Sequence, residues 1–333
     1  MLPFAAAHNL RIIAINQRDY VGSSLYASAE LNRITSPDVE HQESALQAQG
    51  REIAAFLVHV IKSGGVLQVL QDANGKKTGG LALLGWSLGN LIPLSMFGNA
   101  EYLDDETRST LEGYLRTLVL FDTALHPIGE SPPQGLLELQ KPDPKATPKD
   151  RGNPLFSTPF SAYYTPVPDL SASDESSLKS RADVYDESTG MQNKIPTFSR
   201  MSSAELESVS DAAAVPRSGL PLLRIKPDIY RRTSERALFD TKGSFKNVRA
   251  LVVWGDMSVT LCVWAAKRIA ERAEAAKIEG KLGRQVEIVK MEGANHFVSS
   301  YNDSSEQLIL TTFRRKIHWD EPEYTVQFLA AHI

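Results

Sequence analysis

Residues 81–89 read Leu-Ala-Leu-Leu-Gly-Trp-Ser-Leu-Gly, and this stretch decides how the rest of the chain is interpreted. Its apolar start predicts a buried strand, and the Gly-x-Ser-x-Gly pentapeptide after it predicts a sharp turn into a helix. The glycines at 85 and 89 fit a serine held in a strained backbone conformation, because neighbours with a Cβ would collide there. Ser87 is therefore a candidate nucleophile. The alternative is an ordinary Gly/Ser-rich turn between a strand and a helix.

Apolar runs alternate with helix-like segments on both sides of this stretch. The predicted strands are 10–16, 81–84, 118–121, 250–254 and 286–289, and the predicted helices are 43–62, 261–277 and a segment that begins at Leu88. Near-continuous apolar strands separated by helices are typical of a parallel sheet covered on both faces. With 333 residues, 42% of them hydrophobic, the chain can bury a large core. The predicted fold class is α/β with a mostly parallel central sheet.

Residues 127–246 interrupt this alternation. Twelve of the eighteen prolines lie in the first part of this region, from Pro127 to Pro216, among many Ser, Asp and Lys residues. Such a composition predicts a loop-rich segment that is either a lid over a site or a disordered linker. Four aromatic residues of this region could line an acyl or aromatic pocket: Phe156, Phe160, Tyr163 and Tyr164. The chain is thus divided into 1–126, the insertion 127–246, and 247–333.

Composition excludes several classes of partner. The net charge of −4 gives no reason to expect nucleic acid or an anionic membrane as partner, and no apolar run is long enough for a transmembrane helix. One cysteine, Cys262, excludes an internal disulfide and suits the cytoplasm. The last residues, Ala331-His332-Ile333, are a degenerate form of a peroxisomal tail, which chance also explains. No spacing of Cys, His and carboxylate residues predicts a metal or cofactor.

Four segments carry a resemblance to a known superfamily. They are Gln-Arg-Asp-Tyr-Val-Gly-Ser-Ser at 17–24, the pentapeptide at 85–89, Val-Val-Trp-Gly-Asp at 252–256 and Gly-Ala-Asn-His-Phe at 293–297. In these segments the chain resembles the α/β-hydrolases, and their amino-acid sequences are similar to those of fungal members. The resemblance implies a nucleophile elbow at 85–89, an inserted lid, and hydrolysis of an ester or thioester, which in fungal relatives often belongs to secondary metabolism.

The chemistry of such an enzyme assigns roles to three side chains. A serine is a poor nucleophile until a base takes its proton, and a carboxylate must orient that base. His296 follows the last predicted strand in a short turn, and the order Ser, acid, His along the chain is the one that this fold uses. Its role would be general base, with the Leu88 backbone N–H as the donor to the oxyanion.

Two positions compete for the acid. The family usually takes it three residues past the glycine that ends the penultimate strand, and that position here is Ser258. Asp256 lies only one residue past Gly255, a poor offset for reaching the histidine. Other members take the acid from the end of the strand after the elbow, where Asp122 stands. We favour Asp122, with Asp256 as the alternative; either carboxylate could instead cap a helix or lie in a loop.

The chain departs from the family pattern at two places. The family begins with strands ahead of the segment matched to 10–24, and one of them carries a His-Gly turn that completes the oxyanion hole. Its absence would leave backbone groups unpaired at the sheet centre and only one oxyanion donor, so we expect the sequence to be N-terminally incomplete. The second departure is the 19 residues 298–316, which separate the histidine turn from the last helix. The residues at both ends of this segment could be encoded by nucleotide sequences that also serve as splice signals. The segment is therefore either a retained intron or a tolerated surface loop.

The leading hypothesis is a serine hydrolase that acts on a small-molecule ester or thioester without a cofactor. Two alternatives remain open at this point. One is a catalytically impaired, hydrolase-like binding protein or truncated gene product, and the other is an acyltransferase that uses the same three residues.

Overall fold

The protein is described from a computed structural model, which covers all residues except 76, 137–157, 185–193, 210, 212 and 298–321. Its centre is a four-stranded parallel sheet with strand order β3-β4-β5-β6. The strands are β3 (Leu81–Trp86), β4 (Leu115–Phe121), β5 (Arg249–Gly255) and β6 (Val286–Met291). The predicted α/β class with a parallel sheet is therefore confirmed.

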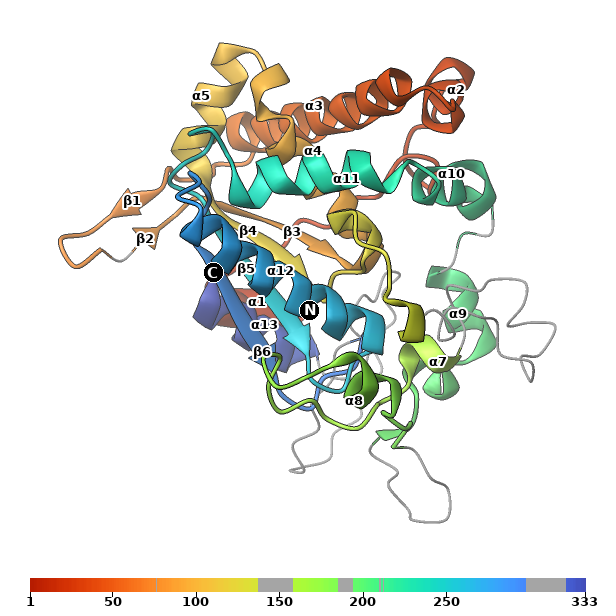
Figure 1. The fold of residues 1–333 in the computed structure, drawn as a ribbon. Helices are drawn as coiled ribbons and strands as arrows, with labels where there is room; N and C mark the ends of the chain where they lie inside the picture. The colour runs from red at the N-terminus through yellow and green to blue at the C-terminus, as the bar shows by residue number, and fades with distance from the viewer. Residues whose placement is uncertain (76, 137–157, 185–193, 210, 212, 298–321) are drawn as a thin grey trace.

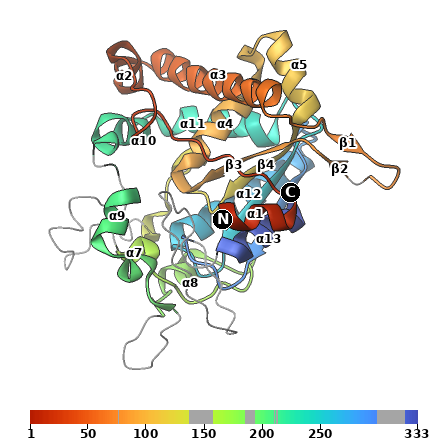
Figure 2. The same cartoon turned by 180° about the vertical axis from the view of Figure 1, so that it is seen from behind.

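Helices cover both faces of this sheet (Figures 1 and 2). One face carries α3 (Val39–Ser63), α4 (Leu91–Gly98) and α12 (Thr260–Ile278), and the other carries α1 (Leu2–Ala5) and α13 (Pro322–His332). The side chains of β4 alternate accordingly: Leu118 and Leu120 pack toward α3 and α12, whereas Val119 and Phe121 pack toward α13. Period-two alternation between two apolar layers is why the strands read as continuous hydrophobic runs.

The remaining described elements surround this core. They are η1 (Ala6–His8), α2 (Ser28–Thr35), the antiparallel pair β1 (Leu70–Gln71) and β2 (Lys77–Thr78), η2 (Ser87–Asn90), η3 (Ala100–Tyr102), α5 (Asp105–Tyr114) and η4 (His126–Ile128). The described elements within the insertion, 127–246, are α7 (Thr158–Ser161), α8 (Glu175–Lys179), η8 (Thr197–Arg200), α9 (Ser203–Val209), η9 (Val215–Gly219), α10 (Leu220–Leu223), α11 (Pro227–Ser234) and η10 (Glu235–Phe239). Among the described helices, none is long and apolar enough to cross a membrane.

Strand register brings the ends of distant segments together. Trp86 pairs with Phe121, and Phe121 pairs in turn with Val253. The residues that follow β3 and β4 therefore leave the sheet at the same edge, because parallel strands share their carboxyl ends. The loop after β6 leaves at this edge too, since Met291 pairs with Gly255.

The strand predicted at 10–16 is not formed, and this prediction is wrong. The segment has no strand assignment, and Ile13 and Ile15 are each 42% exposed. A β-branched run becomes a strand only where a neighbouring strand pairs its backbone groups. Within the described residues β3 pairs with β4 alone, so its outer edge offers 10–16 no recorded pairing. Phe156 and residues 298–316 lie outside the described residues.

Candidate active site

The elbow at Ser87 has the strained geometry that its sequence predicts. Ser87 follows β3 directly with a φ of +53°, in the left-handed region that is costly for a residue with a side chain. A Cβ on Gly85 would lie 2.7 Å from the Asn90 Cα, so glycine is required there. Gly89 is different, because the nearest atom to a Cβ at that position would be the Gln17 amide nitrogen at 3.6 Å. The expectation that both glycines are required is therefore correct for Gly85 only.

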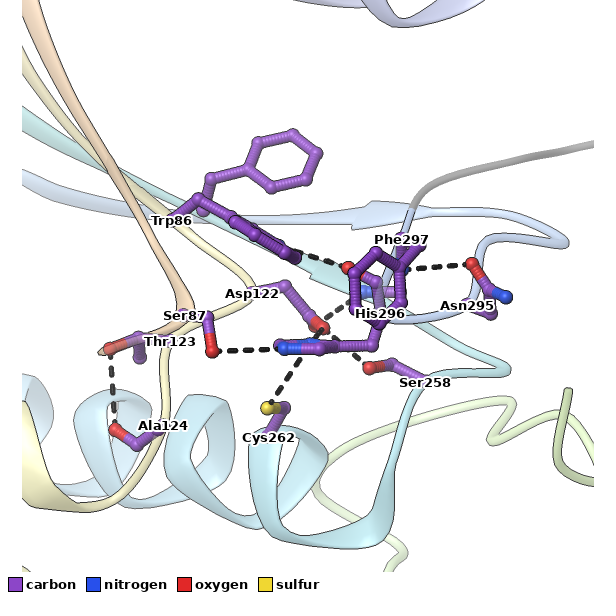
Figure 3. Close-up of polar contacts among 12 residues, drawn as sticks. Trp86, Ser87, Asp122, Thr123, Ala124, Ser258, Cys262, Asn295, His296 and Phe297 are labelled. Atoms are coloured by element: carbon purple, nitrogen blue, oxygen red, sulfur yellow. Dashed lines mark hydrogen bonds and ion pairs between the residues drawn. The ribbon is translucent and has the colours of Figure 1, made fainter. Parts of the chain in front are cut away.

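His296 lies within hydrogen-bond distance of Ser87 although 209 positions separate them. Its Nε2 is 2.9 Å from the Ser87 Oγ, and its ring is almost fully buried. The Trp86 indole N–H donates to the His296 carbonyl at 2.9 Å, which ties the histidine loop to the end of β3 (Figure 3). The residue before the nucleophile thus also positions the candidate base.

Asp122 is the carboxylate that reaches the histidine. Its Oδ2 is 2.6 Å from the His296 Nδ1, and the Asp122 side chain is 1% exposed. Two further groups hold the same carboxylate. The Ser258 hydroxyl, in the loop after β5, donates to Oδ2 at 2.5 Å (Figure 3). The Gly255 N–H, at the end of β5, donates to Oδ1 at 3.2 Å. Asp122 has a φ of +40°, so its backbone is strained like that of Ser87.

Asp256 lies elsewhere. It is buried, but the structure shows no hydrogen bond between its carboxylate and His296 within the described residues, and its Oδ1 has no partner there. Burial raises the pKa of Asp256, an effect that a hydrogen bond from Gly293 only partly offsets. Of the two candidate acids, the structure brings only Asp122 to the histidine.

Two further residues beside the acid were not assigned a role from the sequence. Ser258 occupies the position where the family usually has its acid, and in the structure its hydroxyl donates to Asp122. The Cys262 Sγ lies 3.5 Å from the His296 Nδ1, and burial, together with the neighbouring Asp122 carboxylate, raises the pKa of this thiol. These contacts depend on how the loop after β5 and the start of α12 pack against the end of the sheet, which no local sequence pattern reports.

The atoms of Asp122, Cys262 and His296 could in principle hold a metal ion. One ligand atom from each lies within 4.8 Å of the others, and Zn²⁺ accepts this set of donors. However, the short contact between Nδ1 and Oδ2 already uses two of the three atoms, and a metal would have to break it. The geometry therefore favours a hydrogen bond between His296 and Asp122 over metal binding.

Segments of the insertion lie against the histidine loop. The Asn295 amide donates to the Ser161 carbonyl at 2.8 Å, and the Phe198 ring packs edge-on against Phe297 at a centroid distance of 4.5 Å. Of the aromatic residues predicted to line a pocket, Tyr163 is fully buried and Phe160 is 36% exposed. Phe198 was missed because its contact with Phe297 is made between segments 99 positions apart in the sequence.

Comparison with known proteins adds no assignment. No family model matches the chain, and neither a curated protein nor a solved structure matches it. The functional conclusion therefore depends on the geometry of Ser87, His296 and Asp122.

Proposed function

We propose that this protein is a serine hydrolase of the α/β-hydrolase type, acting on an ester or thioester by acyl transfer. The observation that carries the proposal is the continuous chain of contacts from Ser87 Oγ to His296 Nε2, at 2.9 Å, and from His296 Nδ1 to Asp122 Oδ2, at 2.6 Å. A nucleophile in contact with a base, and a base oriented by a buried carboxylate, is the arrangement that acyl transfer requires.

Each group has one task in this mechanism. As the Ser87 Oγ attacks the substrate carbonyl, His296 Nε2 takes its proton, and Asp122 stabilises the resulting imidazolium. The Leu88 N–H lies in the first turn after the nucleophile and would donate to the oxyanion. His296 then returns its proton to the leaving alcohol or thiol. Water deprotonated by the same nitrogen attacks the acyl-enzyme, releases the acid and restores Ser87.

The strain at Ser87 supports this role. A φ of +53° in a non-glycine residue costs on the order of 1–3 kcal/mol, and such residues cluster at functional sites. Asn90 stabilises this strained conformation, because its amide donates to the Ser87 carbonyl at 2.9 Å. A plain structural turn at this position would not need a serine, because glycine would adopt the conformation without strain.

The position of the insertion supports the hypothesis that it forms a lid over the site. Residues 158–184 and 194–200 contact the loop that carries His296 through Asn295 and Phe297. A cover at this edge would restrict water and shape the acyl pocket. An acyltransferase would use the same three residues, and the choice between the two depends on whether water or another acceptor deacylates the serine. The link to fungal secondary metabolism depends on the resemblance of the sequence alone.

A fluorophosphonate probe tests the proposal directly, because it phosphonylates only a serine that is activated by a neighbouring base. We expect the protein to be labelled and the Ser87→Ala variant to remain unlabelled. Ser109→Ala, which removes an exposed hydroxyl from α5, is the matched control and should be labelled like the parent. A folded parent protein that takes no label would contradict the proposal and favour the binding-protein alternative.

A further inference from the structure

Arg181 is a partly buried cation in the insertion that the proposed mechanism does not use. Its guanidinium donates to three backbone carbonyls: Thr165 and Ser258, each at 2.8 Å, and Asp256 at 2.9 Å. Burial lowers the pKa of Arg181 to about 10, so the protein loses free energy by holding the charge there. Among the described residues, no carboxylate forms an ion pair with this guanidinium. A surface salt bridge therefore does not explain why Arg181 lies at this place.

Two of these carbonyls, those of Asp256 and Ser258, belong to the loop after β5, which contacts the proposed acid Asp122. At the end of β5 and in the loop after it, Gly255 and Ser258 donate to the two carboxylate oxygens of Asp122. Ser258 takes part in both sets of contacts, because its carbonyl accepts from Arg181 while its hydroxyl donates to Asp122. Ser258 is fully buried, so its hydrogen bond to Asp122 does not compete with water. One residue thus connects the insertion to the carboxylate that orients His296.

We propose that Arg181 is a positioning residue for Asp122: it fixes the loop after β5 from the side of the insertion, and Ser258 transmits this fixation to the acid. The inference rests on the proposed function, since it assigns a role within the same site. It implies that the insertion helps to build the catalytic geometry, in addition to any cover that it provides.

The charges around Arg181 are consistent with this role. Asp122 and Asp256 both attract the guanidinium electrostatically, and Tyr164 lies under it with its ring centroid 5.5 Å away. Cys262 faces Asp122 from α12 as a neutral thiol, because burial raises its pKa. Arg181 is thus a cation that two buried carboxylates attract, and Lys290 and Lys194 act on Asp256 as further cations.

Arg284 provides a matched control for a purely structural arginine. It is also buried, burial lowers its pKa to about 9, and it donates to the backbone carbonyls of Ala237, Phe245 and Val248. These contacts lie before β5 and β6 begin, at the opposite end of the sheet from the triad. Replacing either arginine by methionine removes a cation held mainly by backbone carbonyls, although Arg181 also donates to the Thr260 hydroxyl at 3.4 Å. Of the two arginines, Arg181 is the one that contacts the loop after β5.

The experiment compares Arg181→Met, Ser258→Ala and Arg284→Met by the kinetics of fluorophosphonate labelling. We expect the first two to lower the maximal labelling rate by on the order of tenfold to a hundredfold, the loss of one hydrogen bond to a charged group, with half-saturation within about twofold of the parent. Ser258→Thr, which restores the hydroxyl, should recover most of the rate. Arg284→Met should lower the melting temperature and leave the labelling rate of the folded protein unchanged.

A second readout needs no reaction. The proton between His296 Nδ1 and Asp122 should give a low-field ¹H resonance, assigned by its loss in His296→Gln, and Arg181→Met should shift or broaden it while Arg284→Met does not. If Arg181→Met changes only the melting temperature, the inference is overturned and Arg181 is structural. If the parent protein takes no label, the proposed function fails, and the resonance still decides the inference. Should Arg181→Met not fold, Ser258→Ala and Arg181→Lys give the same two readouts.

Discussion

The proposed role of Asp122 as the triad acid leads to a specific prediction for Asp122→Asn. Asparagine is isosteric, and among non-glycine residues it is one of the most tolerant of the left-handed conformation, which Asp122 occupies at a φ of +40°. The backbone should therefore keep its position. The change removes one charge, and it places an amide where the His296 Nδ1–H must find an acceptor.

The magnitude follows from the contact that is lost. The bond between Nδ1 and Oδ2 is 2.6 Å long, joins two buried side chains, and is charge-assisted when the histidine is protonated in the transition state. Removing one partner of a buried charged pair costs about 3–5 kcal/mol. At about 1.4 kcal/mol per factor of ten, the labelling rate should fall on the order of 10²–10⁴-fold. The upper end applies if the amide also forces His296 into the wrong tautomer.

The assay is the rate of fluorophosphonate labelling, measured together with the melting temperature by circular dichroism. Asp256→Asn is the matched control, because it neutralises a buried carboxylate of the same edge that does not contact His296. It should keep the labelling rate within a few-fold of the parent. The reasoning is refuted if Asp256→Asn abolishes labelling while Asp122→Asn, shown to be folded, retains it.

Three further predictions follow from the described contacts. Gly85→Ala places a Cβ 2.7 Å from the Asn90 backbone and should lower stability by about 1–3 kcal/mol, whereas Gly89→Ala has room and should melt within a degree or two of the parent; equal melting temperatures would contradict this. Burial raises the pKa of Asp19, but hydrogen bonds from the Tyr26 N–H and Arg217 lower this pKa by a larger amount. The folded pKa is therefore below that of the unfolded chain. Its stabilisation is present above about pH 4 and is lost as the pH falls through the folded pKa; Asp19→Asn should therefore flatten the decline of the melting temperature below about pH 4, and an unchanged decline would show that this carboxylate does not contribute. The raised pKa of Cys262 keeps its thiol protonated at pH 8, so iodoacetamide should modify this thiol only after unfolding. Mass spectrometry measures the modification, and rapid alkylation of the native protein would argue against this burial.

The sequence alone determined the features that depend on local chemistry. Strands 81–84, 118–121, 250–254 and 286–289 all formed within one or a few residues of their predicted limits. The two central runs are apolar and buried between helical layers, and the two outer strands pair with them. The elbow followed from the small residue at 85, which the close approach of the next helix requires. The predicted helices 43–62 and 261–277 also formed, as α3 and α12.

Tertiary structure decided everything that depends on a distant partner. The run 10–16 has the composition of a strand and did not form one, since pairing needs a neighbouring backbone and composition does not supply it. The choice between Asp122 and Asp256 was open for a similar reason, because both follow parallel strands that end at the same edge of the sheet. Strand register and the loop after β6 then placed His296 Nδ1 2.6 Å from Asp122. Ser258 and Arg181 acquired their contacts only through that same packing, which joins residues 136 and 77 positions apart.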